Sequence, residues 1–296
     1  MTIGPEQESP RPQAGDGFSE AVTVAFGDPS AELFGVARLG LAEGGASGLT
    51  LLFWRGEPVA VRAEGGAEVD GVSSWDEVSA AGLDTSVVEP LRSWRLQFAG
   101  DEASFDLELE STGPLAELPA DSPVARAGGM EGYEQPLRVR GQAAVGDARL
   151  TVDGLGQRGH SWGAPDWKRI ELTRAVSAWM GDDLAVSLTA VRPAGKRDHA
   201  AEVLAAAVLD RDEEGVAHAV DVLDPRLSTT YDGDGRQRQA GLELWIDEDG
   251  YPRRAAGELL CGTSLDLGRL RLDCAFFAWQ MEGRLGFGRY DVLRRA

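Results

Sequence analysis

The most informative segment of the chain is Gly154-Leu-Gly-Gln-Arg-Gly-His-Ser-Trp-Gly-Ala-Pro-Asp-Trp167, which contains one of three histidines and two of eight tryptophans. Its first six residues match the dinucleotide-binding pattern G-x-G-x-x-G, and a strand-like segment over 148–153 precedes them. That pattern needs a helix next, whose N-terminal amides would hold a pyrophosphate. Gly163 and Pro165 stand where the helix would run. We therefore interpret the stretch as a tight β segment and exclude a nucleotide loop.

The composition is that of a globular protein. The 296 residues are 43% hydrophobic, enough for one large or two ordinary domains, and arginine outnumbers lysine 27 to 2, as in GC-rich bacterial genomes. The formal charge of −20 argues against binding to nucleic acid or to anionic membranes. The first 17 residues have no apolar signal region, and the longest apolar run, 203–209, is far shorter than the ~20 residues of a membrane helix. These features predict a cytoplasmic protein.

Hydrophobic residues mostly recur with a period of two, which is typical of half-buried strands. The clearest case is a hairpin in which alternating residues of 94–98 and 105–109 face one side, with a turn at Gly100-Asp-Glu. Further hairpins are predicted around 210–215, 247–250 and 267–268, and Ser74-x-x-Glu77 is a capping box before a short helical segment. Many short strands joined by Gly- and Asp-rich turns predict an all-β fold of antiparallel sandwich or barrel type.

The domain organisation follows from shifts in composition. Residues 1–16 are rich in Pro, Gln, Glu and Gly and are expected to form a disordered tail. We expect one β domain over 17–120, a linker over 121–129 at the end of a Pro-, Ala- and Gly-rich stretch, and a second β domain over 130–296.

The two cysteines carry no sign of a metal site. Cys261 and Cys274 flank the predicted hairpin at 267–268 and are expected to be free thiols in a reducing compartment. No Cys/His spacing typical of metal binding exists, so no metal and no cofactor are expected.

Two further motifs accompany the opening stretch, Gly132-Tyr-Glu-Gln-Pro136 and Gly286-Phe-Gly-Arg-Tyr290. Together the Tyr-Glu-Gln-Pro segment, the long Gly-x-Gly-Gln-Arg-x-His-Ser-Trp-Gly-x-x-Asp-Trp motif and the late Gly-x-Gly resemble the calycin superfamily of hydroxyneurosporene synthase (carotenoid 1,2-hydratase) and AttH-like proteins. The similarity covers about residues 130–170. It implies two lipocalin-like antiparallel β domains that enclose an apolar cavity.

The resemblance also implies a ligand and a chemistry. Members of this superfamily hydrate or cyclise polyenes and terpenoids, and related proteins act in polyketide pathways, some by folding a substrate for pericyclic closure. The expected partner is therefore a hydrophobic small molecule, and the sequence leaves a homodimer open. The His-x-Trp pair of the hydratases corresponds to His160 and Trp162. Many relatives carry Asp immediately before the His, whereas this chain has Gly159.

Hydration or cyclisation of an alkene needs an acid near an apolar substrate. A carboxyl group in an apolar cavity keeps its proton because burial raises its pKa, and aromatic faces stabilise a cation. Imidazole can hold the water or relay its proton. The candidate catalytic residues are His160, Asp166 and Glu134, and the candidate substrate-binding residues are Trp162, Trp167 and Tyr133.

Each candidate also has a structural interpretation. His160 can fix a turn through a backbone carbonyl, the tryptophans can belong to the core, and Asp166 can cap local amides. Glu134 can form an ion pair with Arg158 or Arg138, and the glycines can serve a bulge or a close backbone approach. Three functional hypotheses therefore stand: a hydratase, cyclase or isomerase, a non-catalytic carrier of a hydrophobic intermediate, and an interaction module in which the motif only determines the fold.

Overall fold

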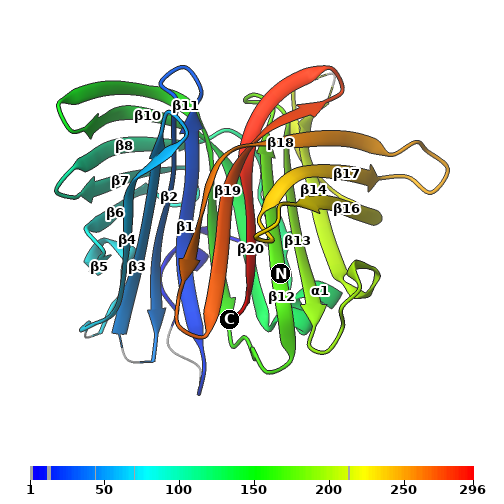
Figure 1. The fold of residues 1–296 in the computed structure, drawn as a ribbon, viewed down its shortest axis with the longest axis horizontal. Helices are drawn as coiled ribbons and strands as arrows, with labels where there is room; N and C mark the ends of the chain where they lie inside the picture. Colours follow the sequence, from blue (N-terminus) through cyan, green and yellow to red (C-terminus); the bar gives the residue numbers. More distant parts are fainter. Residues whose placement is uncertain (1–2, 12–14, 44, 70, 213) are drawn as a thin grey trace. The chain divides into compact units, whose positions relative to one another are not determined.

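The computed structural model describes residues 3–11, 15–43, 45–69, 71–212 and 214–296. The chain forms two compact units, one from Met1–Thr112 and Met130–Pro165, the other from Gly113–Gly129 and Asp166–Ala296. Each unit is built on its own antiparallel sheet (Figure 1). The predicted all-β fold of two antiparallel β units is confirmed.

The sheet of the first unit closes nearly into a barrel. Its strands run in the order β4-β3-β2-β1-β11-β10-β8-β7-β6-β5. The elements of this unit are η1 (Pro5–Glu8), β1 (Ser19–Asp28), β2 (Leu33–Ala42), β3 (Gly45–Trp54), β4 (Glu57–Ala67), η2 (Trp75–Glu77), β5 (Ser79–Ala80), β6 (Leu83–Glu89), β7 (Ser93–Ala99), β8 (Ala103–Ser111), β10 (Met130–Val145) and β11 (Ala148–Gly163).

The hydrophobic core of the first unit lies inside this sheet, as period-two patterning requires. The predicted hairpin is confirmed: β7 pairs with β8 in the register Phe98 opposite Phe105 and Trp94 opposite Leu109. Phe105 contacts both Phe98 and Phe26 with ring centroids 5.4 Å apart. The capping box at Ser74 opens only the single-turn helix η2, where the Ser74 hydroxyl accepts a hydrogen bond from the Asp76 amide.

The sheet of the second unit is a half-barrel. Its strands run in the order β15-β14-β13-β12-β20-β19-β18-β17-β16. The elements of this unit are β9 (Ala116–Leu118), α1 (Pro123–Gly128), β12 (Ile170–Trp179), β13 (Ala185–Pro193), η3 (His199–Ala201), β14 (Val203–Arg211), β15 (Ala217–Asp221), β16 (Asp224–Tyr231), β17 (Gln237–Trp245), β18 (Arg253–Asp266), β19 (Leu270–Met281) and β20 (Arg284–Arg295).

The short helices of the chain serve packing. Val124 of α1 is buried against Ile170 and Val191 of the second sheet. In the part of the chain that the structure describes, no helix has the length and apolar character needed to cross a lipid bilayer.

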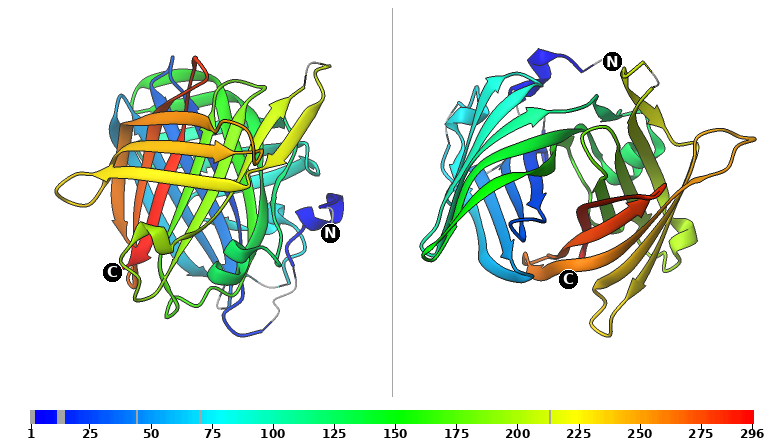
Figure 2. Two further views of the ribbon diagram at one scale, coloured as in Figure 1. Left: turned by 90° about the vertical axis from the view of Figure 1, so that its right-hand side faces the viewer. Right: turned by 90° about the horizontal axis from the view of Figure 1, so that it is seen from above.

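The two sheets share one plan. In each, a meander leads away from the first strand, a second meander follows, and the last strand returns to pair with the first, β11 with β1 and β20 with β12. Figure 2 shows the strands of each sheet curving round that sheet's own interior. The strand order therefore reveals a duplicated architecture that the sequence alone only weakly indicated.

The boundary between the units differs from the expected one at residue 130. Strands β10 and β11 were expected in the second domain, but they pair with β8 and β1 and complete the first sheet. The chain then leaves for the second unit after Pro165, and 113–129 belongs to that unit as well. The reason is long-range pairing: the first sheet can close only when β11 returns to β1, and no local composition records that partner.

The N-terminal segment also differs from the expected disordered tail over 1–16. Residues 1–2 and 12–14 lie outside the described residues. Residues 5–8 form η1, and the Glu8 side chain at its end is buried, 3% exposed. A polar composition predicts disorder because it offers little apolar surface, but Glu8 is held by hydrogen bonds and an ion pair.

Both cysteines are free and buried in the second sheet, as predicted. They lie on neighbouring strands but not opposite each other, since Cys261 pairs with Phe276 and Cys274 with Thr263. Burial raises the pKa of Cys261 to about 12, so its thiol stays protonated and unreactive at neutral pH.

Candidate functional site

The pairing of β10 with β11 sorts the candidate residues onto two faces of the first sheet. Tyr133 lies opposite His160, and Glu134 lies opposite Gly159. Because side chains alternate along a strand, Tyr133 and His160 point into the interior, whereas Glu134 points outward. The glycine-rich motif is thus a continuous strand with two chemically different sides.

His160 is the centre of the inner face. Its side chain is 0% exposed and both ring nitrogens have partners. Nε2 lies 2.7 Å from Glu20 Oε1, and Nδ1 lies 3.3 Å from the Tyr133 hydroxyl. The rings of Trp75 and Trp162 contact the imidazole edge to face, with centroids 5.5 and 5.4 Å away. The imidazole is therefore held in place by two hydrogen-bond partners and two indole rings.

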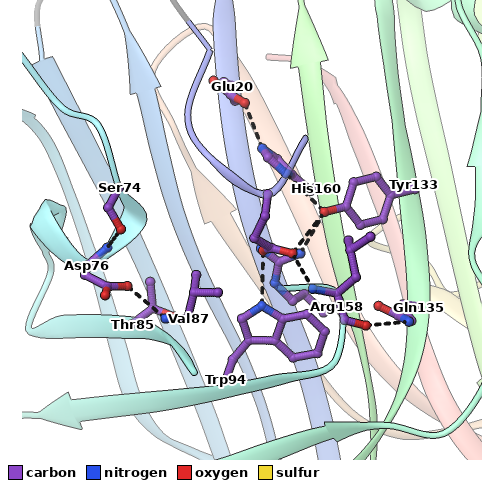
Figure 3. A network of polar contacts seen from close by, with 12 residues as sticks. Glu20, Ser74, Asp76, Thr85, Val87, Trp94, Tyr133, Gln135, Arg158 and His160 are labelled. Carbon is purple, nitrogen blue, oxygen red and sulfur yellow. Dashed lines mark hydrogen bonds and ion pairs between the residues drawn. The ribbon is translucent and has the colours of Figure 1, made fainter. Parts of the chain in front are cut away.

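The hydrogen bonds around His160 form a directed chain, seen in Figure 3 with the Tyr133 hydroxyl between His160 and Arg158. Arg158 Nη1 donates to the Tyr133 oxygen over 3.3 Å. We assign the Tyr133 hydroxyl as the donor of the hydrogen bond to His160 Nδ1. The imidazole then carries its own proton on Nε2, which donates to the Glu20 carboxylate. This assignment keeps the imidazole neutral and leaves Glu20 as the ionised end of the chain.

A second carboxylate enters the same interior from the N-terminal segment. Glu8 forms a buried ion pair with Arg158, and it accepts hydrogen bonds from the Leu91 amide at 3.0 Å and Trp94 Nε1 at 3.1 Å. Arg11 anchors the segment further along by donating to Glu20 through its backbone amide, 2.7 Å, and through Nη1, 2.8 Å. The interior network therefore joins two acids to two arginines.

Sequence reasoning missed this half of the network, which comprises Glu8, Arg11, Glu20, Trp75 and Trp94. Glu20 carried a usable signal. It stands two residues before Val22 and four before Val24. The alternation of side chains along a strand therefore predicts that Glu20 faces the same, buried side as these valines. Glu8 carried none, because only the tertiary fold brings η1 to Arg158.

The electrostatics of this network favour an ionised Glu20 and a neutral His160. Burial opposes ionisation of Glu20, but the hydrogen bonds from His160 and Arg11 outweigh it and lower its pKa. Burial lowers the pKa of His160 below its ordinary value, and the contact with Glu20 only partly offsets this. Burial also raises the pKa of Tyr133 to about 12, so the phenol keeps its proton.

This buried imidazole predicts a pH dependence of stability. Below the ordinary histidine pKa of 6.5, the unfolded chain takes up a proton that folded His160 refuses, so the free energy of unfolding falls on acidification. We expect a loss of about 1 kcal/mol between about pH 7.5 and pH 5.5, measured by urea unfolding. The variant His160→Gln should lose this slope while the other two histidines remain; an unchanged slope would contradict the assignment.

A small cavity borders the network on the side of Arg158. The cavity that borders Arg158, Trp94, Val22 and Val24 has a volume of about 10 Å³, room for about one water molecule. The resemblance implied two β domains that enclose an apolar cavity, and this space beside Arg158 is too small to be that cavity.

The outward face presents a different arrangement around Glu134. Gln157 Nε2 donates to its carboxylate. A Cβ built on Gly159 would lie 3.6 Å from Glu134 Cγ and 3.6 Å from Oε1, at ordinary contact distance. The neighbouring residues of β1 on this face are small, since Ala21 pairs with Ser161 and Thr23 with Gly159. The Glu134 side chain thus contacts Gln157 and lies near the small residues Ala21 and Thr23 of β1.

The remaining two candidates belong to the second unit. Asp166 lies in an exposed turn, where its carboxylate accepts a hydrogen bond from the Lys168 amide at 2.9 Å. Trp167 packs against the cluster of Ile170 and Val191. The structure therefore brings together Tyr133, His160 and Trp162 inside the first sheet and Glu134 on its outer side, with Asp166 and Trp167 in the other unit.

The strand plan defines the class of this protein: its fold is that of the AttH-like calycin proteins, as the sequence motifs implied. A protein described as AttH from Nitrosomonas europaea aligns over 95% of this chain and 93% of its own, with 13% identity and a TM-score of 0.69. Kievitone hydratase from Nectria haematococca aligns over 94% and 89%, with 13% identity and a TM-score of 0.65. CghA in its complex with Sch210972 aligns over 95% and 89%, with 11% identity and a TM-score of 0.67.

At these identities the likeness concerns the fold alone. The chain belongs to the family described as a domain of unknown function, DUF7064, which matches residues 4–296. A search of the curated proteins found no match.

Proposed function

We propose that this protein binds a hydrophobic polyene, terpenoid or polyketide intermediate and promotes its hydration, cyclisation or isomerisation without a cofactor, with Glu134 as the acid. The observation that carries the proposal is the position of Glu134 beside Gly159. A Cβ built on Gly159 would lie 3.6 Å from the Oε1 atom of Glu134. The resemblance described under Sequence analysis implies Asp at that position in many relatives. In this chain the Glu134 carboxylate, coming from the neighbouring strand, reaches the same space.

The acid step needs only the carboxyl group and water. Protonated Glu134 gives its proton to one alkene carbon, and the neighbouring carbon becomes a cation. Water adds to that carbon and returns a proton to the carboxylate, which restores the acid; in a cyclisation a second alkene attacks instead of water. The proposal places a flat apolar substrate against Ala21 and Thr23, the small residues of β1 that pair beside Gly159. A hydratase among the proteins of this fold, kievitone hydratase, supports the same class of reaction.

We assign His160, Tyr133 and Trp162 to positioning rather than to contact with substrate. Both imidazole nitrogens are engaged, and the ring is enclosed by aromatic side chains. The chain of hydrogen bonds fastens β1, β10 and β11 to one another, and Glu134 and Gly159 stand on the reverse side of these same strands. A rigid pair of strands holds the Glu134 carboxyl in one place.

The variant Glu134→Gln tests the acid. We expect turnover to fall by about 10²–10⁴-fold, the usual contribution of a positioned general acid, because the amide keeps the shape and loses the transferable proton. Neurosporene and kievitone are suitable first probes, with mass spectrometry to detect gain of one water or an isomer of unchanged mass. Glu131→Gln makes the same change on the same strand and should keep its turnover within about two-fold.

Ligand binding separates this proposal from a carrier role. Native mass spectrometry of the purified protein should reveal a co-purifying hydrophobic molecule in the wild type and in Glu134→Gln alike, with conversion by the wild type only. Conversion at equal rates by both proteins would show that Glu134 is not the acid. Binding by both without conversion of any bound molecule would favour the non-catalytic carrier.

A further inference from the structure

The carboxylate of Glu8 occupies a well-formed anion cage in the first unit. Arg158 Nη2, Trp94 Nε1 and the Leu91 amide all donate to it, and the Tyr133 hydroxyl lies 3.5 Å from Oε2. The donors come from two places in the first unit: Arg158 from β11, and Trp94 and Leu91 from β7 and the turn that precedes it. A buried guanidinium needs an anionic partner, because an unpaired charge in the interior is strongly unfavourable. The cage therefore needs an anion, which in this structure is the Glu8 carboxylate.

The segment that delivers this carboxylate is held at few points. Of residues 3–11, which we call the strap, only Glu8 is buried. Apart from Glu8, Arg11 makes the main attachment: it donates to Glu20 and its guanidinium lies 3.2 Å from the centroid of the Trp162 ring. A segment fastened mainly by charged contacts belongs to the low-stability end of a fold and can open locally.

The second unit contains a similar group of a glutamate, an arginine and a tyrosine, in which the glutamate is held between two paired strands. Glu202 pairs with buried Arg174, and Arg174 Nη1 donates to the Tyr290 hydroxyl at 3.3 Å. Glu202 lies in the connection between β13 and β14, and both of these strands are paired in the sheet. Glu8 instead lies in η1 and in no strand, so its departure breaks no strand pairing.

We propose that the cage of Arg158, Trp94 and the Leu91 amide is a binding site for the carboxylate of a hydrophobic acid, and that Glu8 occupies it in cis. An incoming ligand places its carboxylate on the Arg158 guanidinium in place of Glu8. Its apolar part packs on the Trp162 face that Arg11 covers while the strap is closed. The ligand class is a carboxylic acid with an apolar chain, such as a fatty acid or an acidic polyketide. This site lies on the inner face of the sheet and does not depend on the reaction proposed at Glu134.

Chemical rescue tests the cage. The variant Glu8→Ala leaves Arg158 without its anion and should lower Tm, and acetate should then raise Tm by about 5 °C more than chloride at equal ionic strength. Wild type should show no such difference, because Glu8 fills the cage. The double variant Glu8→Ala/Arg158→Met should also lose the acetate effect, since no guanidinium remains to bind it. Equal shifts with acetate and chloride in Glu8→Ala would overturn the proposal.

Displacement of the strap is tested on the wild-type chain, so the test does not depend on whether a variant folds. A glutamate-specific protease should cut slowly after Glu8 in the free protein, because that side chain is buried. Octanoate should accelerate this cut several-fold, whereas octanol, which has the same chain without the charge, should not. Intact-mass spectrometry reports the loss of residues 1–8. An unchanged or slower rate with octanoate would show that no external carboxylate competes with Glu8, whatever the outcome for Glu134.

Discussion

Replacement of Arg158 by methionine is expected to lower the free energy of unfolding by about 3–5 kcal/mol, because it leaves the Glu8 carboxylate buried without its charge partner. The pair is almost fully buried, 4% and 3% exposed at the two side chains, so water cannot take the place of the guanidinium. Arg158 also donates to the Tyr133 hydroxyl, and its loss loosens the chain that ends at His160. Thermal unfolding should show Tm lowered by roughly 10 °C.

Two comparisons isolate the charge from the lost volume. Arg95→Met removes an arginine from the exposed pair with Asp106 and should change Tm little, because solvent screens that pair. Adding Glu8→Gln to Arg158→Met removes the stranded charge, and the new amide oxygen can still accept from Trp94 Nε1; this double variant should regain at least half of the loss. If Arg158→Met were no less stable than Arg95→Met, the buried ion pair would have no part in holding the fold.

Replacement of Gly154 by alanine is expected to lower the free energy of unfolding by about 3 kcal/mol, because the new methyl group would clash with the neighbouring strand. A Cβ on Gly154 would lie 2.0 Å from the carbonyl oxygen of Gly27, a backbone atom of the neighbouring strand. Accommodation requires β1 and β11 to separate, and this pairing is the one that closes the first sheet. Urea unfolding of the variant measures the effect.

Gly159→Ala on the same strand is the matched control, with the opposite sign. Its Cβ would meet nothing closer than 3.6 Å, and alanine costs less conformational entropy on folding than glycine. We expect Gly159→Ala to stabilise the protein by about 0.5 kcal/mol. The expected order of stability is therefore Gly159→Ala, wild type, Gly154→Ala, and equal losses in the two variants would refute the distinction between a closed and an open glycine position.

Local patterning was sufficient to predict several strands of this protein. The alternation of Trp94, Leu96 and Phe98 with polar residues predicted the β7–β8 hairpin, because a strand with one buried face must alternate. Local sequence was also sufficient to exclude a nucleotide-binding loop, since Gly163 and Pro165 stand where the helix of that motif would have to begin. The resemblance carried by the motif of 154–167 also predicted the fold, which the three solved structures share.

Partners far apart in the chain were not predictable in this way. The boundary expected at residue 130 ignored the return of β11 to β1, and the tail expected over 1–16 ignored the burial of Glu8. Composition reports whether a segment can bury apolar surface, whereas Glu8 is buried by charge. The division of Tyr133 and Glu134 between two faces, by contrast, follows from the period of two once both are known to lie in one strand.

Alternation and glycine content act over a few residues, and they predicted antiparallel β sheets and a glycine-rich strand that carries His160 and Trp162. The calycin fold was predicted from the resemblance of the motifs. What surrounds His160 and Trp162 depends on the folding of the whole unit. This folding enclosed His160 between Glu20 and Tyr133 and brought Glu8 onto Arg158 across 150 residues of chain. It also set Glu134 beside the empty side-chain position of Gly159. Electrostatic and packing partners of this kind are fixed by sheet closure, which is a property of the whole unit and of no single segment.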